Sequence, residues 1–357
     1  MTSAGVASLK NQTVIAVDAM GGDDAPEMVI DGLAIACDRH PDTRFLVFGD
    51  EARVVPLLEK HPKLKAACTM VPTEDVVAGD AKPSVAVRSG RKSSLWLAIQ
   101  AVKNGDAAGV VSAGNTGAFM AMSKLVLRTL PGIDRPAIAT IVPTQRGDNV
   151  VLDLGANSEC DANNLVEFAI MGDAFARTVL GLEKPLVGIM NLGSEEGKGT
   201  DSEREAADTL KNSPLPINFH GFVEGDDLSK GTVDVIVTDG FTGNVMLKTL
   251  EGTTKLYSHF LRQAYGSSWL AKLGYLLSRP ALNRLKSRVD PRRYNGAMLL
   301  GLNGVAVKSH GGTDAFGFAC AVSVAQDMIS QGINDLIRSE IEKLSLPGKG
   351  ASRAVAG

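Results

Sequence analysis

The stretch VVSAGNTGAFMA, from Val110 to Ala121, contains a unit that recurs along the chain and decides the fold. Small and β-branched residues lead into a Gly-Asn-Thr-Gly turn, and an apolar run of helical character follows. A strand, a glycine-rich turn and a helix in this order can offer backbone N–H groups at a helix N-terminus to an anion. The stretch lacks the common phosphate signatures GxGxxG and Gly-Lys-Ser/Thr, and such a turn is often a plain connection. Other features of the chain must decide between a connection and a site.

The same unit occurs four more times, in residues 13–37, 149–176, 185–210 and 233–261. In each, a β-branched run is followed by a Gly- or Asn-bearing turn and an amphipathic helical pattern. Residues 137–154 differ, because two strand-like runs flank Pro-Thr-Gln-Arg-Gly-Asp, which predicts an antiparallel hairpin. We therefore expect an α/β fold, a mainly parallel, doubly wound sheet with helices on both faces.

The chain is expected to form one large α/β unit over residues 13–345. A tail at 1–12 precedes it, and a flexible tail at 346–357 follows it. The chain has 357 residues and a formal net charge of −3, so no overall positive field favours nucleic acid as a partner. The first residues have no apolar core of signal-peptide length, and no apolar run approaches the roughly 20 residues that span a bilayer. We expect a cytoplasmic protein.

The four cysteines, Cys37, Cys68, Cys160 and Cys320, lie far apart without a CxxC motif. This spacing argues against a zinc site and against a disulfide framework. We expect no metal and no other cofactor.

Asp and Asn residues follow the strand of every repeated unit. They are Asp18, Asn115, Asn157, Asn191, and Asp239 together with Asn244. In open α/β sheets, ligands bind outside the carboxyl ends of the strands, so these turns are predicted to converge on one crevice. Each residue could instead be only a turn former or a helix cap. Their recurrence at five strand ends favours the crevice.

Glycine-rich turns and two lysines define the chemistry predicted for this crevice. Backbone N–H groups in the turns can approach phosphate or a developing oxyanion. Lys198 and Lys308 adjoin such turns, and on an extended segment Lys308 shares a face with His310. A solvated lysine and a hydrogen-bonded histidine are the alternatives. No GxSxG motif and no evident Cys-His pair indicates a covalent nucleophile.

Seven motifs in order carry a resemblance to a known family. They are VDAMGGDDAP, SAGNTGA, RPAIATIVPT, LDLGAN, GSEEGKGT, TDGFTGNVMLKTLEG and GLNGVAVKSHG. From about Thr13 to Leu344 the chain resembles the acyl-ACP:phosphate acyltransferases, the PlsX family of bacterial phospholipid synthesis. The resemblance implies a fold of the isocitrate/isopropylmalate dehydrogenase-like type, a homodimer, and conversion of acyl-ACP and inorganic phosphate to acyl phosphate and free acyl carrier protein (ACP).

Direct attack by phosphate needs no activated side chain, because the dianion is already charged at neutral pH. We expect Lys198 and Lys308 to hold anions and His310 to supply a proton to the leaving thiolate. Asp18 and Asp239 are expected to orient donors, since bare carboxylates would repel phosphate. The expected catalytic residues are Lys198, Asp239, Asn244, Lys308 and His310. The expected substrate-binding residues are Asp18, Gly21, Gly22, Asp23, Ser112, Gly114, Asn115, Thr116, Gly117, Asn157 and Gly240.

A local basic segment, about 266–293, is predicted to form a protruding helical hairpin broken at Pro280. It contains Lys272, Arg279, Arg284, Lys286, Arg288, Arg292 and Arg293 but only Asp290 as an acid. With its apolar faces, residues 268–289 can lie on an anionic membrane. The segment could equally dock an acidic carrier protein or pack on a dimer partner. The family's peripheral membrane association favours the inner face of the membrane.

Two other functions remain open from the sequence. A decarboxylating dehydrogenase of similar fold would need a metal-binding carboxylate cluster and clustered arginines, and neither pattern is evident. A membrane-bound scaffold for lipid-synthesis proteins would need no chemistry in the crevice.

Overall fold

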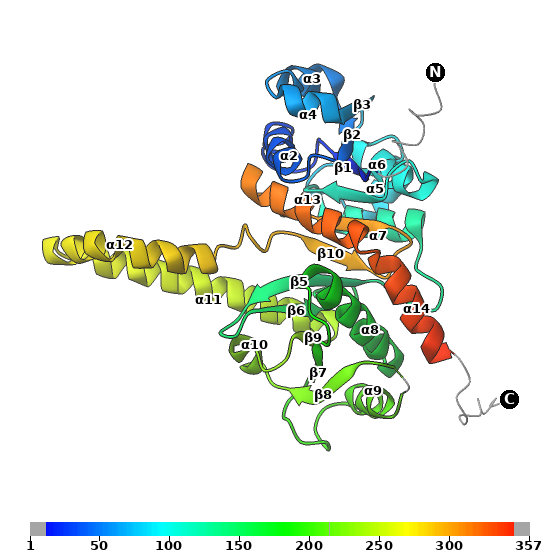
Figure 1. Cartoon of the computed structure of the whole chain (residues 1–357), viewed down its shortest axis with the longest axis vertical. Coiled ribbons are helices and arrows are strands. Elements are labelled where there is room, and N and C mark those ends of the chain that lie inside the picture. Colours follow the sequence, from blue (N-terminus) through cyan, green and yellow to red (C-terminus); the bar gives the residue numbers. More distant parts are fainter. Residues whose placement is uncertain (1–11, 214, 346–357) are drawn as a thin grey trace.

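The computed structural model describes residues 12–213 and 215–345, and within them one sheet of eleven strands runs through the molecule (Figure 1). The strand order is β3-β2-β1-β4-β11-β10-β5-β6-β9-β7-β8. The strands are β1 (Val14–Asp18), β2 (Arg44–Gly49), β3 (Cys68–Pro72), β4 (Gly109–Ser112), β5 (Ala137–Pro143), β6 (Asp148–Leu152), β7 (Leu186–Met190), β8 (Asn218–Val223), β9 (Val235–Val237), β10 (Ala297–Leu300) and β11 (Val305–Lys308). This confirms the expected α/β class.

Two opposed groups of parallel strands make up the sheet. β3, β2, β1, β4 and β11 run one way, and β6, β9, β7 and β8 run the other way. The reversal comes from β10, which is antiparallel to β11 and β5, and from the antiparallel pair of β5 and β6. The predicted hairpin within residues 137–154 is thereby confirmed.

Helices cover both faces of the sheet, as expected. They are α2 (Glu27–Arg39), α3 (Glu51–Leu58), α4 (Pro62–Ala67), α5 (Pro83–Ser89), α6 (Ser94–Asn104), α7 (Thr116–Leu127), α8 (Ala162–Val179), α9 (Asp201–Asn212), α10 (Asp227–Lys230), α11 (Gly240–Gly266), α12 (Trp269–Arg288), α13 (Ala315–Ser330) and α14 (Ile333–Ser345). One core joins α2, α8, α13 and α14 to one face. On the other face, α6 and α7 pack over the first half of the sheet, and α10 and α11 pack over the second half. Alternating side chains of buried strands supply both cores.

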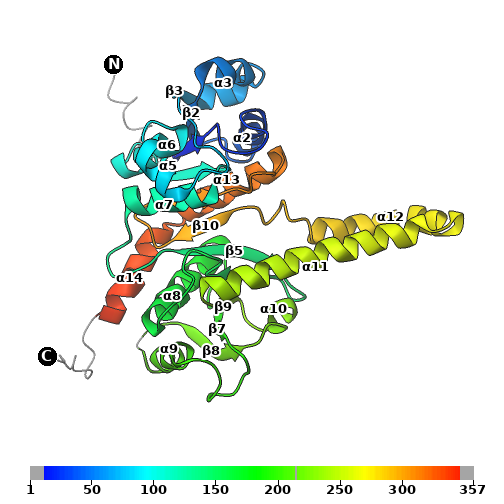
Figure 2. The ribbon, with the colours of Figure 1, turned by 180° about the vertical axis from the view of Figure 1, so that it is seen from behind.

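The protruding hairpin is larger than the sequence predicted. It consists of α11 and α12, which lie side by side and extend away from the body in both views (Figures 1 and 2). Residues 266–293 therefore form only its returning arm, and Pro280 lies inside α12 instead of ending a helix. A proline inside a helix removes one hydrogen bond and costs roughly 3 kcal/mol. α12 nevertheless continues through this position to Arg288.

The two expected tails fall mainly on residues 1–11 and 346–357, outside the described residues. Within residues 12–213 and 215–345, no helix combines the length and the apolar character that crossing a membrane requires.

Candidate active site

Three residues from adjacent strands form a polar row at one edge of the sheet. Asp18 at the end of β1 is in register with Ser112 at the end of β4, which is in register with Lys308 at the end of β11. Ser112 donates a hydrogen bond of 2.7 Å from its hydroxyl to the carboxylate of Asp18. The strand pairing places all three side chains on the face that α6 and α7 cover.

The carboxyl group of Asp18 is almost completely buried, with 2% of the residue exposed. Ser94, at the start of α6, donates a second hydroxyl hydrogen bond to it at 2.6 Å, and the Met20 amide donates a third at 3.2 Å. Burial raises the pKa of Asp18, and the hydrogen bonds and the charge of Lys308 offset part of this effect. Asp18 therefore holds the hydroxyl groups of Ser94 and Ser112 in place.

Lys308 is a buried cation, with 5% of the residue exposed. Its ammonium group donates a hydrogen bond to the carbonyl oxygen of Ser309. Burial lowers the pKa of Lys308 to about 8, while Asp18 and Asp23 act in the opposite direction. Such a lysine is charged at neutral pH and is shielded from water, so it can attract an anion strongly.

Tight glycine turns bring the backbone close to this row. A Cβ on Gly21 would lie 2.5 Å from the nitrogen of Gly114, so two turns touch here. Gly22 has φ of +122°, which only glycine adopts readily. The Asp23 amide donates to the carbonyl oxygen of Gly311 at 3.0 Å. The turns after β1, β4 and β11 therefore meet, and N–H groups at the start of α7 lie at the same edge.

Asn295 fixes the loop that carries His310. Its amide donates to the hydroxyls of Ser309 at 2.8 Å and Thr313 at 3.3 Å. Its carbonyl oxygen accepts from the backbone N–H of His310 at 3.0 Å. The His310 side chain is exposed, and its Nδ1 accepts from the Gly312 amide at 3.2 Å.

Asn115 is a helix cap whose amide is already engaged. Its side-chain oxygen accepts from the Ala118 amide at 2.8 Å, and its amide nitrogen donates to the carbonyl oxygens of Gly79 and Ala81. The expectation that Asn115 offers its side chain to substrate is therefore wrong for this conformation, because the amide ties α7 to the loop between β3 and α5. Thr116 begins α7 and is exposed, and a Cβ on Gly117 would lie 2.7 Å from Pro83.

A second cluster surrounds Asp153, at the end of β6. This buried carboxylate accepts hydrogen bonds from the amides of Ile138, Ala156 and Asn157 and from the side chain of Asn157. Burial raises the pKa of Asp153. The Asn157 side chain also donates to the carbonyl oxygen of Pro136, so its amide nitrogen has two acceptors.

Asp239, Gly240 and Asn244 belong to the second cluster. Asp239 caps α11 by accepting from the Thr242 amide at 2.9 Å. A Cβ on Gly240 would lie 2.8 Å from the carboxylate of Asp153, and Asn244 lies beside Gly155 and is exposed.

The expectation that all five turns converge on one crevice is wrong within one chain. β6, β9 and β7 run opposite to β1, β4 and β11, so the carboxyl ends of the two groups lie at opposite edges of the sheet. Lys198 follows β7 and is exposed, whereas Lys308 is buried at the other edge. The structure does not bring these two lysines together.

Three polar residues of these clusters were not anticipated. Ser94 and Asn295 are brought to the site by packing of distant segments, so no local pattern indicates them. Asp153 had a signal, because it follows a buried strand as Asp18 does. Among residues 12–213 and 215–345, no group of three or more His, Cys, Asp or Glu side chains could hold a metal ion.

The fold and this edge define an α/β protein with a buried lysine among closely packed glycine turns. The fold is similar to that of a phosphotransacetylase from Streptococcus pyogenes, with a TM-score of 0.59, 18% identity, and coverage of 92% of this chain and 99% of that one. A branched-chain phosphotransacylase from Enterococcus faecalis gives a TM-score of 0.54 at 12% identity, with 89% and 100% coverage. At these identities the likeness concerns the fold alone.

Sequence relatives identify the family. Residues 13–336 match the family described as "Fatty acid synthesis protein". A phosphate acyltransferase of Rhodospirillum rubrum is 70% identical over 338 residues, which are 95% of this chain and 97% of that protein. A phosphate acyltransferase of Paramagnetospirillum magneticum is 60% identical over 343 residues, or 96% and 98% of the two chains. The chain belongs to this family, and it is an acyltransferase.

Proposed function

We propose that the chain transfers an acyl group from acyl-ACP to inorganic phosphate, giving acyl phosphate and free ACP for phospholipid synthesis. The buried, charged Lys308 between glycine-rich turns is the observation that carries this proposal. The names of the relatives support phosphate as the acceptor. The family description supports a fatty acyl group as the group that is transferred.

The reaction can proceed by direct attack. Lys308 and backbone N–H groups hold phosphate, and an oxygen of the dianion attacks the thioester carbonyl carbon. Another N–H donor in the turns stabilises the resulting oxyanion, a contribution of roughly 2.7–4 kcal/mol for a well-placed donor. The carbon–sulfur bond then breaks, and His310, as the imidazolium with Nδ1 released from the Gly312 amide, gives a proton to the leaving thiolate. The acyl hydrogen phosphate returns a proton to His310 when it leaves as the acyl phosphate dianion. Asp18 keeps Ser94 and Ser112 oriented and supports the charge of Lys308.

Hydroxylamine trapping tests this activity directly. Purified protein, acyl-ACP and phosphate should yield an acyl hydroxamate together with free ACP thiol, and omission of phosphate should abolish both. Thiol release without a trappable acyl group would indicate hydrolysis. A dehydrogenase or a scaffold would give neither product.

The hairpin supports a proposal about location and partners. We propose that residues 268–289 bind the anionic inner face of the cytoplasmic membrane peripherally, in a homodimeric enzyme. None of the side chains of α12, all of which the structure describes, is buried, and Trp269 and Leu277 are 74% and 76% exposed. Lys272, Arg279, Arg284 and Lys286 also lie on this arm, where apolar and cationic groups suit an anionic lipid surface. Arg288 and Arg292 are instead paired with Asp148 and Asp314 at its root.

A further inference from the structure

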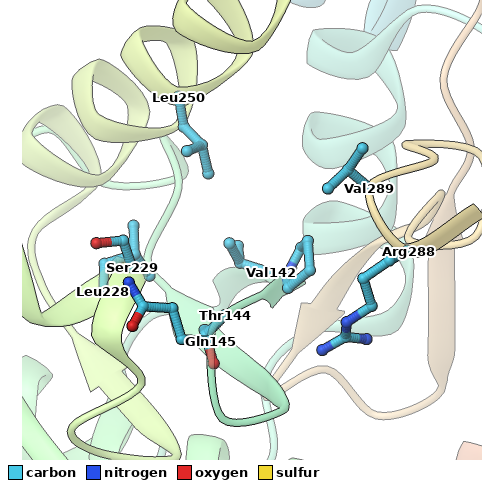
Figure 3. A pocket seen from close by; sticks show the side chains of 9 residues that line it. Val142, Thr144, Gln145, Leu228, Ser229, Leu250, Arg288 and Val289 are labelled. Atoms are coloured by element: carbon cyan, nitrogen blue, oxygen red, sulfur yellow. The ribbon is translucent and has the colours of Figure 1, made fainter. Parts of the chain in front are cut away.

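An apolar cavity lies at the root of the hairpin, where α11 and α12 join the body. It has a volume of about 250 Å³. Val142 of β5, Leu228 of α10, Leu250 of α11 and Val289 after α12 form apolar walls, and the rest of the lining is Pro143, Thr144, Gln145, Ser229 and Arg288. Leu250 and Val289 project into the space between them from opposite sides, with Val142 beneath (Figure 3). No role in the reaction proposed above has used this cavity.

Strand register places the cavity on the same face of the sheet as Lys308. Lys308 is paired with Ala297. Because the next residue, Met298, is paired with Ala139, Ala297 lies opposite Thr140. Lys308, Ala297 and Thr140 therefore form one row across three neighbouring strands. The Thr140 hydroxyl donates to the carbonyl oxygen of Gly296 at 3.4 Å, which confirms that these strands adjoin. Because side chains alternate along a strand, Val142 projects to the same face as Thr140.

The direction of the strands places the cavity toward the same edge as Lys308. β5 is antiparallel to β10, which is antiparallel to β11, so β5 and β11 run the same way. Val142 therefore lies toward the carboxyl end, two residues beyond the level of Lys308. With strands about 4.8 Å apart and a rise of about 3.3 Å per residue, the separation is on the order of 12 Å.

The face between the two positions is not fully covered. Ala297 and Thr140 are only half-buried, although their strands are in the middle of the sheet. Val142 and Leu228, at the far end of this path, are buried and apolar. A chain that starts beside Lys308 can therefore cross Ala297 and Thr140 before it reaches the cavity.

We propose that this cavity is the subsite for the distal part of the substrate's acyl chain. The inference rests on the proposed acyl transfer to phosphate, which places the thioester carbonyl beside Lys308. The apolar chain attached to that carbonyl is stabilised when it is removed from water. The path and the cavity provide a mainly apolar surface for it on the same face of the sheet as Lys308. A volume just below the roughly 300 Å³ of small ligand pockets suits a segment of a long chain. The cavity should therefore favour long chains over short ones.

Narrowing the cavity tests this subsite. The variant Leu250→Trp adds bulk to one wall, and Leu256→Trp is the matched control because Leu256 is 52% exposed on the same helix and does not line the cavity. We expect Leu250→Trp to lower kcat/KM for hexadecanoyl-ACP about tenfold relative to hexanoyl-ACP. Leu256→Trp should leave this ratio unchanged. Activity on hexanoyl-ACP reports that each variant is folded.

A second variant and a binding assay separate the possible failures. Val289→Trp narrows the opposite wall and should shift the same ratio if Leu250→Trp does not fold. Equal effects on both chain lengths in both variants would overturn the subsite while acyl transfer by the wild type stands.

If the wild type forms no acyl phosphate, the proposed function fails. Binding of a fluorescent fatty acid then decides the subsite, because it should be weaker in Leu250→Trp than in Leu256→Trp, and equal binding would overturn it.

Discussion

Lys308 is a cation that folding has largely removed from water, and Asp18 and Asp23 offset only part of that cost. Asp18 is itself buried and depends on the hydroxyls of Ser94 and Ser112. The two residues therefore share one polar environment in an otherwise apolar part of the sheet. A bound anion would complete this arrangement by giving Lys308 a further negative partner.

The pKa of Lys308, lowered to about 8, predicts how activity depends on pH. The lysine is charged below this pH and becomes neutral as pH rises through it, so anion binding should weaken on the alkaline side. We expect kcat/KM for phosphate to fall about tenfold per pH unit well above pH 8. Lys308→Arg keeps its charge and should lose this decline. Circular dichroism verifies folding, and the same decline in folded Lys308→Arg would assign it to another group.

Cys160 is predicted not to be a nucleophile. Burial, together with the carboxylates of Asp153 and Asp239, raises the pKa of its thiol to about 12. A thiol in this environment is not ionised at neutral pH. Cys160→Ala should therefore keep most of the wild-type kcat, and mass spectrometry should show no acyl-protein adduct with acyl-ACP alone. A loss of about a thousandfold, roughly 4 kcal/mol, with a trapped adduct on the wild type would make Cys160 the nucleophile.

At the scale of elements, the segment after α12 joins the hairpin to the loop that carries His310. Arg292 pairs with Asp290 and with Asp314, the residue that caps α13. Three residues further, Asn295 bonds to both ends of the loop from Ser309 to Thr313. The geometry of His310 therefore depends on a segment that also anchors the hairpin.

Asn295→Ala is expected to damage catalysis more than stability. It leaves the His310 amide and two hydroxyls without their partner, and about 1–3 kcal/mol is typical for such a loss. We expect kcat/KM to fall by about tenfold or more, with a small change in Tm. Asn303→Ala is the control, because Asn303 donates to a backbone carbonyl, that of Thr129, away from this loop. A shift in Tm that accounts for the whole loss of activity would indicate a structural role only.

The exposed leucines of α12 are predicted to contact the membrane. Leu273 and Leu277 are exposed on this helix, and replacing both with Glu adds negative charge to a surface expected to meet anionic lipid. Co-sedimentation with phosphatidylglycerol vesicles should be lost, while turnover of water-soluble substrate stays within about twofold. Leu125→Glu with Leu192→Glu, exposed leucines outside the hairpin, should co-sediment like the wild type. Unchanged co-sedimentation of the α12 variant would exclude membrane binding through these leucines.

At the scale of the whole molecule, the sequence predicted local units well and their relative direction poorly. The βα units and the hairpin of β5 and β6 follow from hydrophobic periodicity and turn residues. The reversal depends on β10, a four-residue strand inserted between β11 and β5 from far along the chain. Asp18, Ser112 and Lys308 could be predicted from the sequence because each ends a strand. Ser94 and Asn295 could not, because they reach the site only through tertiary packing. α11 also runs to Gly266, beyond residue 261, where the predicted unit ends. Its outer part lies alongside α12 (Figures 1 and 2), a pairing that no local pattern indicates.

The two edges of the sheet lead to different expectations for the two lysines. Lys308→Met should raise the KM for phosphate at least about tenfold, because it removes the buried cation beside the glycine turns. Lys198→Met should change it less than about threefold, because Lys198 is exposed at the opposite edge, after β7. Initial rates over a range of phosphate concentrations measure both effects. If Lys198→Met is as damaging as Lys308→Met, one chain cannot hold the complete site, and another copy must bring its second edge to the first. Activity would then fall on dilution below the concentration at which the copies dissociate, whereas a site built by one chain keeps its specific activity.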